Sequence, residues 1–454
     1  MSARIMADVW SVPSMLHKAL LALGLLSLFD NQPETAATFQ PIQWPSMEAV
    51  ISWQSPWMLA VNQPDPAAKA IVGSYLNGLI NQGLPTDEQG IWIQTGATAI
   101  AVHQGDQALS AASLTKIATT LAALDTWKIN HRFETLIGYT GVIENGTLQG
   151  DLVIRWDGDP YFVWEEAIAI ANALQQQGIQ EVAGNLVILG DFAMNFQTDS
   201  GLSGELFRQA VDANLWPAEV WGLYDRMPPG TAQPSLMIQG QVIVKPTAAT
   251  SEVSRWLVRH ESLQLVALLK AMNIYSNNEM AEQLARAVGG TNTVVAKVMK
   301  ETQIPASEIR LINGSGLGNE NRISPRAAVA MLLAIQRQLR PLGLSVADVM
   351  PVFGQDEGTL IFREVPDQSA LKTGTLATVS ALAGVFPTRD RGPVWFSIQN
   401  RGTNIESLRA QQDSLLLALE QHWGEAVPPA YLQPKVIIGN APHQLGDPER
   451  NLPF

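Results

Sequence analysis

Two hairpin patterns near opposite ends of the chain constrain its fold more than any other feature of the sequence. The first joins Gly90–Thr95 and Thr98–His103, which are rich in β-branched and aromatic residues and are separated by a glycine turn. The second joins Val379–Phe386 and Val394–Asn400. One antiparallel sheet can hold both hairpins if the intervening chain leaves the sheet and returns to it. The sequence therefore predicts an α+β core assembled from both ends of the chain.

Helical patterns accompany each hairpin. Asp65 resembles a helix N-cap followed by proline, and apolar residues then recur at i+4 until Gly83. Ile405–Trp423 carries an apolar stripe on one face. These helices and the segments between them would cover the sheet. The further predicted helices are Ala112–Leu124, Glu261–Met272, Asn278–Val288 and a helix after Pro325.

Residues 141–245 differ in character from the sequence around them. They contain short Val/Ile/Leu segments bounded by Gly, Asp and Asn, which predict an inserted β-rich subdomain. The proline-rich end of the chain is expected to be a loose strap or disordered. The predicted division is 1–48 for an export or anchor segment, 60–140 and 246–425 for the two parts of the core, 141–245 for the insert, and 426–454 for the tail.

An apolar segment near the start of the chain predicts export. Ala19–Phe29 follows Lys18 and has the length and composition of a signal-peptide apolar region. The alternative is an amphipathic or buried helix of the same length. The chain has no run of 18 or more apolar residues, so no well-formed spanning helix is expected. We expect a periplasmic protein, or one at the outer face of the cytoplasmic membrane with peripheral membrane association through this segment.

The composition excludes several classes of protein. Of the 454 residues, 46% are hydrophobic and 16% are charged, which excludes disorder over most of the length. The net charge of −13 and the lack of basic runs argue against a nucleic-acid partner. The absence of cysteine excludes disulfides, a thiolate nucleophile and a cysteine metal site. The six histidines are scattered and no phosphate-binding loop is present, so neither a metal nor a cofactor is expected.

The pair Ser113 and Lys116 is the first candidate for catalysis. The i, i+3 spacing at a helix start places a hydroxyl and an amine on one face, where the amine could accept the serine proton. A lysine serves as a base only if burial or a neighbouring cation keeps it neutral. The alternative is an N-cap serine and a surface lysine. A second Ser-x-x-Lys match, Ser369–Lys372, leads into a strand and is set aside.

Two further motifs carry polar groups. Ser276-x-Asn278 lies between two predicted helices, where its alternative role is ordinary helix capping. Lys372-Thr-Gly-Thr375 opens a predicted strand, and its alternative is a solvated strand start. Its two hydroxyls and its ammonium would suit a carboxylate, while Gly374 leaves room for close backbone approach. The turn Gly314-Ser-Gly316 is interpreted as structural.

The three motifs, in this order, resemble the set found in penicillin-binding proteins and active-site serine β-lactamases. The resemblance is closest to the D-alanyl-D-alanine carboxypeptidase/endopeptidase family of low-molecular-mass, class C penicillin-binding proteins, over roughly residues 65–425. Outside the motifs it rests on 131–135, the Gly-Asp-Pro of 158–160 and 313–324. The chain departs from the family at Asn313, where an acidic residue is usual, and in its shorter insert.

The resemblance implies a β-lactamase/transpeptidase-like core and a role for each motif residue. The implied roles are: Ser113, acylated nucleophile; Lys116, general base; Ser276, proton shuttle; Asn278, ligand of the substrate amide; Lys372, Thr373 and Thr375, carboxylate clamp; Gly374, room for the substrate backbone; and the N–H groups of Ser113 and Thr375, oxyanion hole.

The resemblance also implies hydrolysis of the terminal D-alanyl-D-alanine bond, or of a crosslink, in peptidoglycan. Peptidoglycan peptides and β-lactams would be the ligands. A serine β-lactamase remains an alternative, although no Glu-x-x-x-Asn segment lies between Ser276 and Lys372, as class A enzymes use for deacylation. A non-catalytic peptidoglycan-binding protein is the second alternative.

Overall fold

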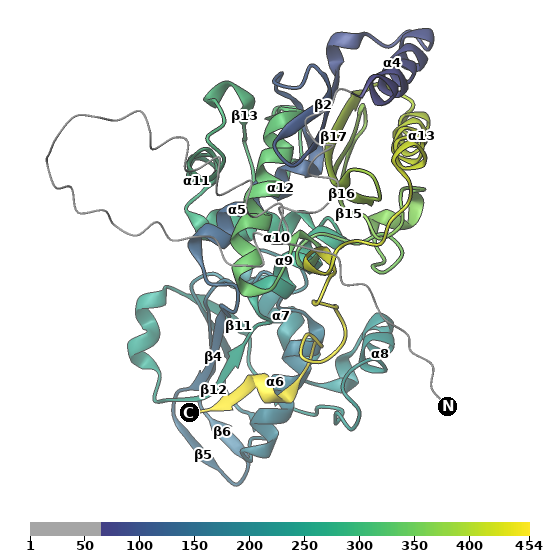
Figure 1. Cartoon of the computed structure of the whole chain (residues 1–454). Helices are drawn as coiled ribbons and strands as arrows, with labels where there is room; N and C mark the ends of the chain where they lie inside the picture. Colours follow the sequence, from purple (N-terminus) through teal and green to yellow (C-terminus); the bar gives the residue numbers. More distant parts are fainter. Residues whose placement is uncertain (1–64) are drawn as a thin grey trace, which may run out of the picture. The chain divides into compact units, whose positions relative to one another are not determined.

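The hairpins from the two ends of the chain do share one sheet. The computed structural model describes residues 65–454, and Figure 1 shows the arrangement of these elements. The sheet is antiparallel, with strand order β15-β16-β17-β1-β2, and it pairs Ile93 with Phe396. Both predicted hairpins are therefore confirmed. The strands are β1 (Gln89–Thr95), β2 (Thr98–His103), β15 (Ala370–Leu376), β16 (Val379–Thr388) and β17 (Gly392–Arg401).

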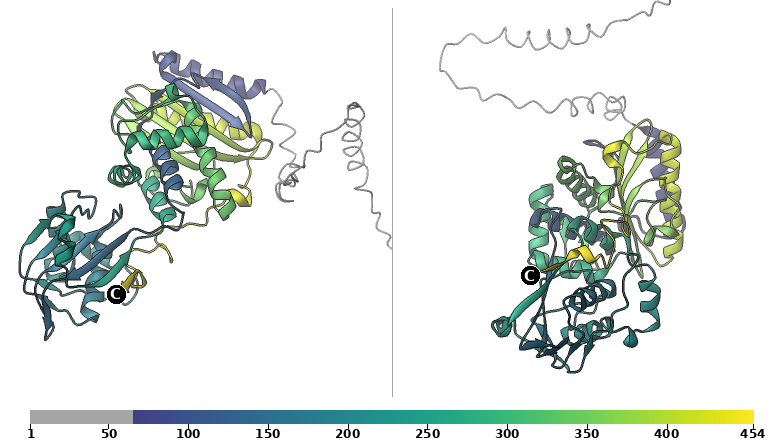
Figure 2. Two further views of the ribbon diagram at one scale, coloured as in Figure 1. Left: turned by 90° about the vertical axis from the view of Figure 1, so that its left-hand side faces the viewer. Right: turned by 90° about the horizontal axis from the view of Figure 1, so that it is seen from below.

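Helices from both ends of the chain cover one face of this sheet. These are α4 (Pro66–Asn81) and α13 (Ile405–Trp423), which lie side by side in Figures 1 and 2. Their apolar stripes pack with the sheet residues Ile91 and Phe396 in one buried cluster. Both predicted helices are thus confirmed, and the apolar stripes provide the physical reason for their position.

The other face of the sheet is covered by helices from the middle of the chain, which share a second buried cluster with it. Two predicted starts are wrong. The helix predicted from Glu261 begins later because Glu261 ends a strand, and the helix predicted from Ala112 begins with a 3-10 turn. The elements are η3 (Ala112–Leu114), α5 (Thr115–Thr126), α9 (Leu265–Ile274), α10 (Asn278–Val288), α11 (Thr291–Thr302), α12 (Pro325–Leu339), and a small sheet of β3 (Leu109–Ser110), β13 (Ile309–Arg310) and β14 (Arg322–Ile323).

Two more sheets form the region between the hairpins. One has the order β11-β9-β7-β4-β12-β18 and the other β10-β8-β6-β5. Their elements are β4 (Glu134–Tyr139), β5 (Val142–Glu144), β6 (Thr147–Gln149), β7 (Leu152–Trp156), α6 (Trp164–Gln176), β8 (Glu181–Val182), β9 (Leu186–Leu189), α7 (Ser200–Ala210), α8 (Ala218–Tyr224), β10 (Met237–Ile238), β11 (Val242–Lys245), β12 (Arg255–Glu261) and β18 (Asn451–Pro453).

Short 3-10 helices connect many of these elements. They are η2 (Thr86–Glu88), η4 (Ala213–Leu215), η5 (Thr247–Glu252), η6 (Ala306–Glu308), η7 (Arg340–Leu342), η8 (Val346–Asp348), η9 (Thr359–Phe362), η10 (Ala430–Leu432) and η11 (Pro448–Arg450).

The six-stranded sheet extends beyond the predicted insert of 141–245. Strand β4 lies before this range and β12 lies after it. Because these two strands pair with each other, both belong to the six-stranded sheet. Three helices that the prediction of a β-rich subdomain did not include, α6 to α8, lie between these strands. The proline-rich tail also contains a strand, β18, which pairs with β12. Arg450 fixes this end of the tail by donating from Nη2 to the buried Glu166 carboxylate at 2.6 and 2.8 Å.

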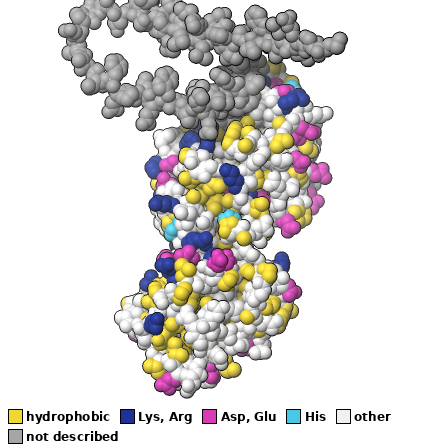
Figure 3. Space-filling view, turned by 60° about the horizontal axis from the view of Figure 1, so that its bottom comes forward, with side chains coloured by type: hydrophobic (Ala, Val, Ile, Leu, Met, Phe, Trp, Pro, Cys, Tyr) yellow, Lys and Arg dark blue, Asp and Glu magenta, His cyan; other side chains and the backbone are white. Residues whose placement is uncertain are grey.

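The surface of the described residues shown in Figure 3 carries mixed charges. On the face shown in Figure 3, Lys and Arg side chains lie in small groups among acidic and hydrophobic ones. None of the helices in the described part is both long and apolar enough to span a membrane. The apolar segment Ala19–Phe29 lies outside the described residues.

Asp65 joins three segments of the core that are distant in sequence. Its carboxylate accepts hydrogen bonds from Ala68 N at 2.9 Å, Trp423 Nε1 at 2.8 Å and Arg391 Nη2 at 3.0 Å. His422 Nε2 lies 3.1 Å from Oδ1. Burial alone would raise the pKa of Asp65, but the hydrogen bonds from Ala68, Trp423 and His422 outweigh it and lower the pKa to about 2. The ionised carboxylate therefore holds α4 against the end of α13.

We expect Asp65→Asn to lower the free energy of unfolding by about 3 kcal/mol at neutral pH, because it removes the buried negative charge that accepts hydrogen bonds from Ala68 N, Trp423 Nε1 and Arg391 Nη2. The folded-state pKa of Asp65 is depressed, so this contribution is present above the ordinary pKa of 3.8 and is lost as the pH falls toward 2. Chemical denaturation of both proteins across this range measures the difference. The exposed Asp390→Asn is the matched control and should change stability little. Equal effects of the two substitutions would contradict the role of Asp65.

Candidate active site

Ser113 lies in the 3-10 turn η3, immediately before α5. The residue before it, Ala112, has a positive φ of 45°, which turns the chain sharply into the helix. The Ala112 carbonyl packs against Gly316, where an added Cβ would lie 1.8 Å from its oxygen. Ser113 is only partly buried, and it lines a pocket. Its hydroxyl is thus held at the N-terminal end of the buried helix α5.

Lys116 lies one turn after Ser113 and is fully buried. Its Nζ donates to Ser113 Oγ at 3.1 Å, to Asn278 Oδ1 at 2.8 Å and to the Ser315 carbonyl at 2.8 Å. These partners come from η3, from the start of α10 and from the turn after β13. The predicted neighbourhood of Ser113, Lys116 and Asn278 is therefore present. A surface lysine, the alternative reading, is wrong.

Burial is the main influence on the charge of Lys116. It lowers the pKa of this lysine to about 7, and the nearby Glu282 carboxylate acts in the opposite direction. The Glu282 carboxylate accepts hydrogen bonds from Gly314 N at 3.0 Å and Ser315 N at 2.9 Å, whereas the Lys116 amine donates to other acceptors. A large fraction of Lys116 is consequently neutral near pH 7 and able to accept a proton.

Ser276 and Lys372 form a second hydroxyl–amine pair. Ser276 lies between α9 and α10 with a positive φ of 51°. Lys372 Nζ donates to Ser276 Oγ at 3.0 Å and to the Thr373 carbonyl at 2.8 Å. Burial, together with the charge of Lys116, lowers the pKa of Lys372 well below its usual 10.5. The pair therefore brings a second hydroxyl to the pocket that Ser113 lines.

The two asparagines after Ser276 have separate roles. Asn277 is the N-cap of α10, and its side chain accepts from Met280 N at 3.0 Å. Because Asn277 provides the cap, the side chain of Asn278 is free to accept from Lys116. Helix capping explains Asn277 but not Ser276 or Asn278.

Strand β15 forms one wall of the site. Gly374 approaches η3 so closely that an added Cβ would lie 3.1 Å from Ser113 N and 2.9 Å from the Ala111 carbonyl oxygen. Thr373 and Thr375 both line the pocket. Thr373 Oγ1 donates to Thr359 Oγ1 at 2.8 Å, and Thr375 Oγ1 accepts from Arg409 Nη2 at 2.8 Å. The close approach at Gly374 agrees with the sequence prediction.

The pocket has a volume of about 430 Å³. Ser113 and Ser276 lie on it together with the two threonines of β15, while the side chains of Lys116 and Lys372 are buried behind it. A serine next to a lysine of lowered pKa can act as a nucleophile, and hydroxyl groups can bind an anionic group of a substrate. The remaining lining residues are Tyr275, Gly358, Thr359, Phe362, Arg363 and Arg409.

Glu282, Thr359 and Arg409 are among the residues of the site that were not predicted from the sequence. Glu282 lies one turn after Asn278 on α10, and this i, i+4 spacing is the one signal that could have indicated it. Thr359 and Arg409 come from η9 and α13, far from the motifs, so their positions depend on the tertiary fold. Among the described residues, no group of three or more histidine, aspartate or glutamate side chains is arranged to hold a metal ion.

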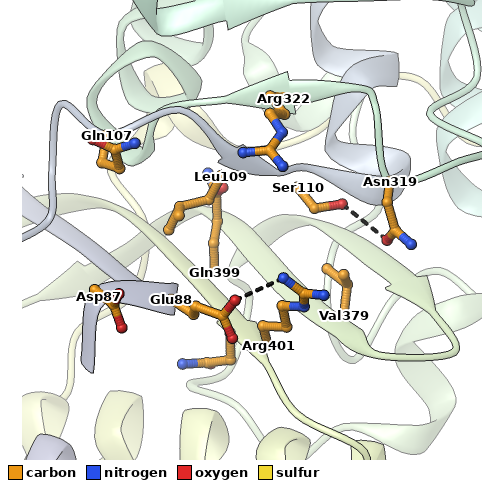
Figure 4. Close-up of a pocket in the computed structure, with 11 residues that line it drawn as sticks. Asp87, Glu88, Gln107, Leu109, Ser110, Asn319, Arg322, Val379, Gln399 and Arg401 are labelled. Carbon is orange, nitrogen blue, oxygen red and sulfur yellow. Dashed lines mark hydrogen bonds and ion pairs between the residues drawn. The ribbon is translucent and has the colours of Figure 1, made fainter. Parts of the chain in front are cut away.

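A second pocket, of about 220 Å³, shares no lining residue with the first. Figure 4 shows Glu88 paired with Arg401 on one side of it, and Ser110 bonded to Asn319 on the other. Arg322 lies across the pocket from the Glu88–Arg401 pair (Figure 4). None of the predicted catalytic residues lines this second pocket.

The fold and the site together define an active-site serine enzyme of the transpeptidase and β-lactamase type. Solved structures share this fold. A penicillin G-acylated form of the predatory endopeptidase Bd3459 from Bdellovibrio bacteriovorus has a TM-score of 0.65 at 21% identity, covering 76% of this chain and 97% of that one. Penicillin-binding protein 4 (dacB) of Haemophilus influenzae has a TM-score of 0.58 at 19% identity, covering 77% and 99%.

The model of the D-Ala-D-Ala carboxypeptidase 3 (S13) family matches residues 76–197 and 233–422, and the chain belongs to this family. The D-alanyl-D-alanine carboxypeptidase DacB of Haemophilus influenzae is 25% identical over 393 residues, which cover 64% of this chain and 80% of the relative. The D-alanyl-D-alanine carboxypeptidase of Actinomadura sp. strain R39 is 26% identical over 247 residues, covering 50% and 42%. The protein is thus a serine peptidase in class, and the family resemblance is confirmed.

We expect Gly316→Ala to slow acylation of the site serine by about tenfold or more, since small displacements of reacting groups are costly. The new Cβ would overlap the Ala112 carbonyl oxygen and displace either η3 or the turn that provides the Ser315 carbonyl to Lys116. The rate of labelling by a fluorescent penicillin measures the effect, with circular dichroism to verify folding. Gly73→Ala, which meets nothing within 4 Å on α4, is the matched control. Normal labelling of a folded Gly316→Ala protein would contradict the expectation.

Proposed function

We propose that the protein hydrolyses the terminal D-alanyl-D-alanine bond of peptidoglycan peptides through an acyl-enzyme on Ser113. The observation that carries this proposal is the 3.1 Å contact between Ser113 Oγ and the amine of Lys116, whose pKa is lowered to about 7. A serine hydroxyl becomes an effective nucleophile when such a base can remove its proton. The same chemistry would open a β-lactam ring, so penicillins are expected to acylate Ser113.

The proposed reaction has two steps. Ser113 Oγ bonds to the substrate carbonyl carbon as its proton passes to Lys116 Nζ. Ser276, next to Lys372, then delivers a proton to the amine of the leaving D-alanine and is reprotonated from Lys116, and the C–N bond breaks. In the second step water bonds to the ester carbonyl carbon and gives one proton to Lys116, and the bond to Ser113 Oγ breaks as Lys116 returns that proton to this oxygen. The N–H groups of Ser113 and Thr375 are the proposed donors to the oxyanion.

Substrate recognition is assigned to the remaining motif residues. Asn278 is proposed to bind the substrate amide, because it lies within hydrogen-bond distance of Lys116 beside the nucleophile. Thr373 and Thr375 are proposed to bind the free carboxylate at the end of the peptide, because both line the pocket. Gly374 leaves no side chain between this strand and Ser113. Relatives named as D-alanyl-D-alanine carboxypeptidases support this class of substrate.

The β-lactamase alternative has no observation in its favour. Class A β-lactamases deacylate the penicilloyl ester with a carboxylate that activates water. The carboxylate near Lys116 belongs to Glu282, and its two oxygens accept from Gly314 N and Ser315 N. These bonds give Glu282 a structural role in the turn. The penicilloyl adduct is therefore expected to persist.

The substrate also bears on where the protein acts. Peptidoglycan lies outside the cytoplasmic membrane, so a protein that hydrolyses it has to be exported. The apolar segment Ala19–Phe29 is the proposed export signal, and a peripheral membrane association is assigned to the same segment. Relatives that are named as peptidoglycan or D-alanyl-D-alanine enzymes support this proposal.

Mass spectrometry after penicillin treatment is expected to place the adduct on the peptide that contains Ser113. Ser113→Ala should remove the adduct and the carboxypeptidase activity while leaving the fold intact, because Ser113 is only partly buried. Ser369→Ala is the control, since Ser369 belongs to the second Ser-x-x-Lys sequence and donates to the Pro366 carbonyl. An adduct on Ser276, Ser315 or Ser369 would contradict the assignment.

The rate of acylation is expected to rise with pH through about 7, where Lys116 loses its proton. Below this value the amine is charged and cannot accept the Ser113 proton, so the rate should fall about tenfold per pH unit. Rates of penicillin labelling between about pH 5 and pH 9 measure the profile. Lys116→Ala should lower the rate by about 10²–10⁴ and remove this dependence. An identical profile in that variant would show that another base operates.

A further inference from the structure

The sequence assigned the charge of the carboxylate clamp to Lys372, but this side chain does not face the pocket. Lys372 is fully buried and is not among the residues that line the pocket. Its Nζ already donates to Ser276 Oγ and the Thr373 carbonyl. Burial and the charge of Lys116 also lower the pKa of Lys372, which weakens it as a permanent cation. A substrate carboxylate bound by Thr373 and Thr375 needs another source of positive charge.

The charged residues that line the active-site pocket are two arginines, Arg363 and Arg409. No carboxylate from residues 65–454 lines the same pocket. Arg363 is buried and engaged, because it donates from Nε to Asp413 at 2.9 Å and from Nη2 to Gln412 Oε1 at 3.1 Å. Asp413 neutralises its charge in this buried pair. Arg363 therefore supports the pocket wall instead of attracting an anion.

Unlike Arg363, Arg409 is only partly buried and is not paired with a carboxylate among the described residues. It projects from α13 and donates from Nη2 to Thr375 Oγ1 at 2.8 Å, with no ion pair to any carboxylate in the part of the chain that the structure describes. A guanidinium has five N–H donors in a planar fork that matches a carboxylate. One donor is used by Thr375, so others are available to an anion beside it.

The acidic groups near Arg409 do not neutralise its positive charge in the active-site pocket. Arg409 also lines an adjoining pocket of about 440 Å³ that contains Glu364, Glu406 and Asp413. Asp413 is paired with Arg363 and accepts from Glu364 N. Glu406 lies one turn before Arg409 on the exposed side of α13. The acidic residues thus line only the adjoining pocket, whereas the threonine hydroxyls line the pocket that contains Ser113.

We propose that Arg409 supplies the positive charge that binds the terminal carboxylate of the substrate, together with the hydroxyls of Thr373 and Thr375. The assignment rests on the proposed carboxypeptidase function. Lys372 then serves Ser276 in proton transfer and does not contact the carboxylate. Arg409 is accordingly a specificity-determining residue that selects substrates ending in a free carboxylate.

The test compares two peptides that end in D-alanyl-D-alanine, one with a free carboxylate and one with a terminal carboxamide. Arg409→Gln should lower kcat/KM for the free acid by about tenfold or more, the loss of one charge-assisted interaction, and leave the rate for the amide nearly unchanged. Arg409→Lys should restore part of the preference. Arg401→Gln, which removes an exposed cation from the end of β17, is the matched control and should leave both rates unchanged.

Acylation by benzylpenicillin and by its methyl ester separates binding of the carboxylate from chemistry at Ser113. Arg409→Gln should slow acylation by the free acid and not by the ester. Equal losses for acid and amide, or no loss for either, would overturn the role of Arg409 even though the wild type cleaves the peptide. Failure of the wild type to cleave the acid or to form the Ser113 adduct would instead overturn the proposed function, and this assignment with it.

Discussion

The burial of the Lys116 amine is the constraint on which the rest of the site depends. An amine removed from water is tolerated only where polar partners surround it, and here the acceptors come from three separate segments: Ser113, Asn278 and Ser315. Each acceptor depends on a different local structure. Ser113 lies in a 3-10 turn, Ser315 lies in a tight glycine turn, and Asn278 begins a helix that Asn277 caps. The lysine thus links the geometry of α5, α10 and the turn after β13 to a single proton acceptor.

Much of the core could be predicted because its signals are local. Alternation and glycine turns identify the two hairpins, and the apolar stripe of Ile405–Trp423 identifies a helix with the observed bounds. The motif residues Ser113, Lys116 and Asn278 were predicted from spacing and resemblance, and the structure brings them together. Local patterns succeed here because the elements bury the faces that their own sequences make apolar.

The parts that sequence reasoning missed depend on contacts between distant segments. Thr359 and Arg409 reach the pocket from η9 and α13, and no motif marks either residue. The start of α9 was placed too early because Glu261 continues strand β12, whose partner β4 lies far away in the sequence. The predicted clamp counted the Lys372 ammonium with the hydroxyls of Thr373 and Thr375, although alternation places Lys372 on the other strand face. Alternation alone does not show that this face is fully buried.

The pairing of β18 with β12 has a consequence for the order in which the chain can fold during synthesis. Both hairpins and α13 are complete by Trp423, so every strand of the five-stranded sheet exists before the tail does. The outer edge of β12, in contrast, has no partner among the described strands until 451–453 emerge, and until then the Glu166 carboxylate lacks the Arg450 guanidinium. An unpaired strand edge can pair with other chains. Residues 451–453, which are synthesised after both hairpins, therefore close an edge that the other described strands leave open.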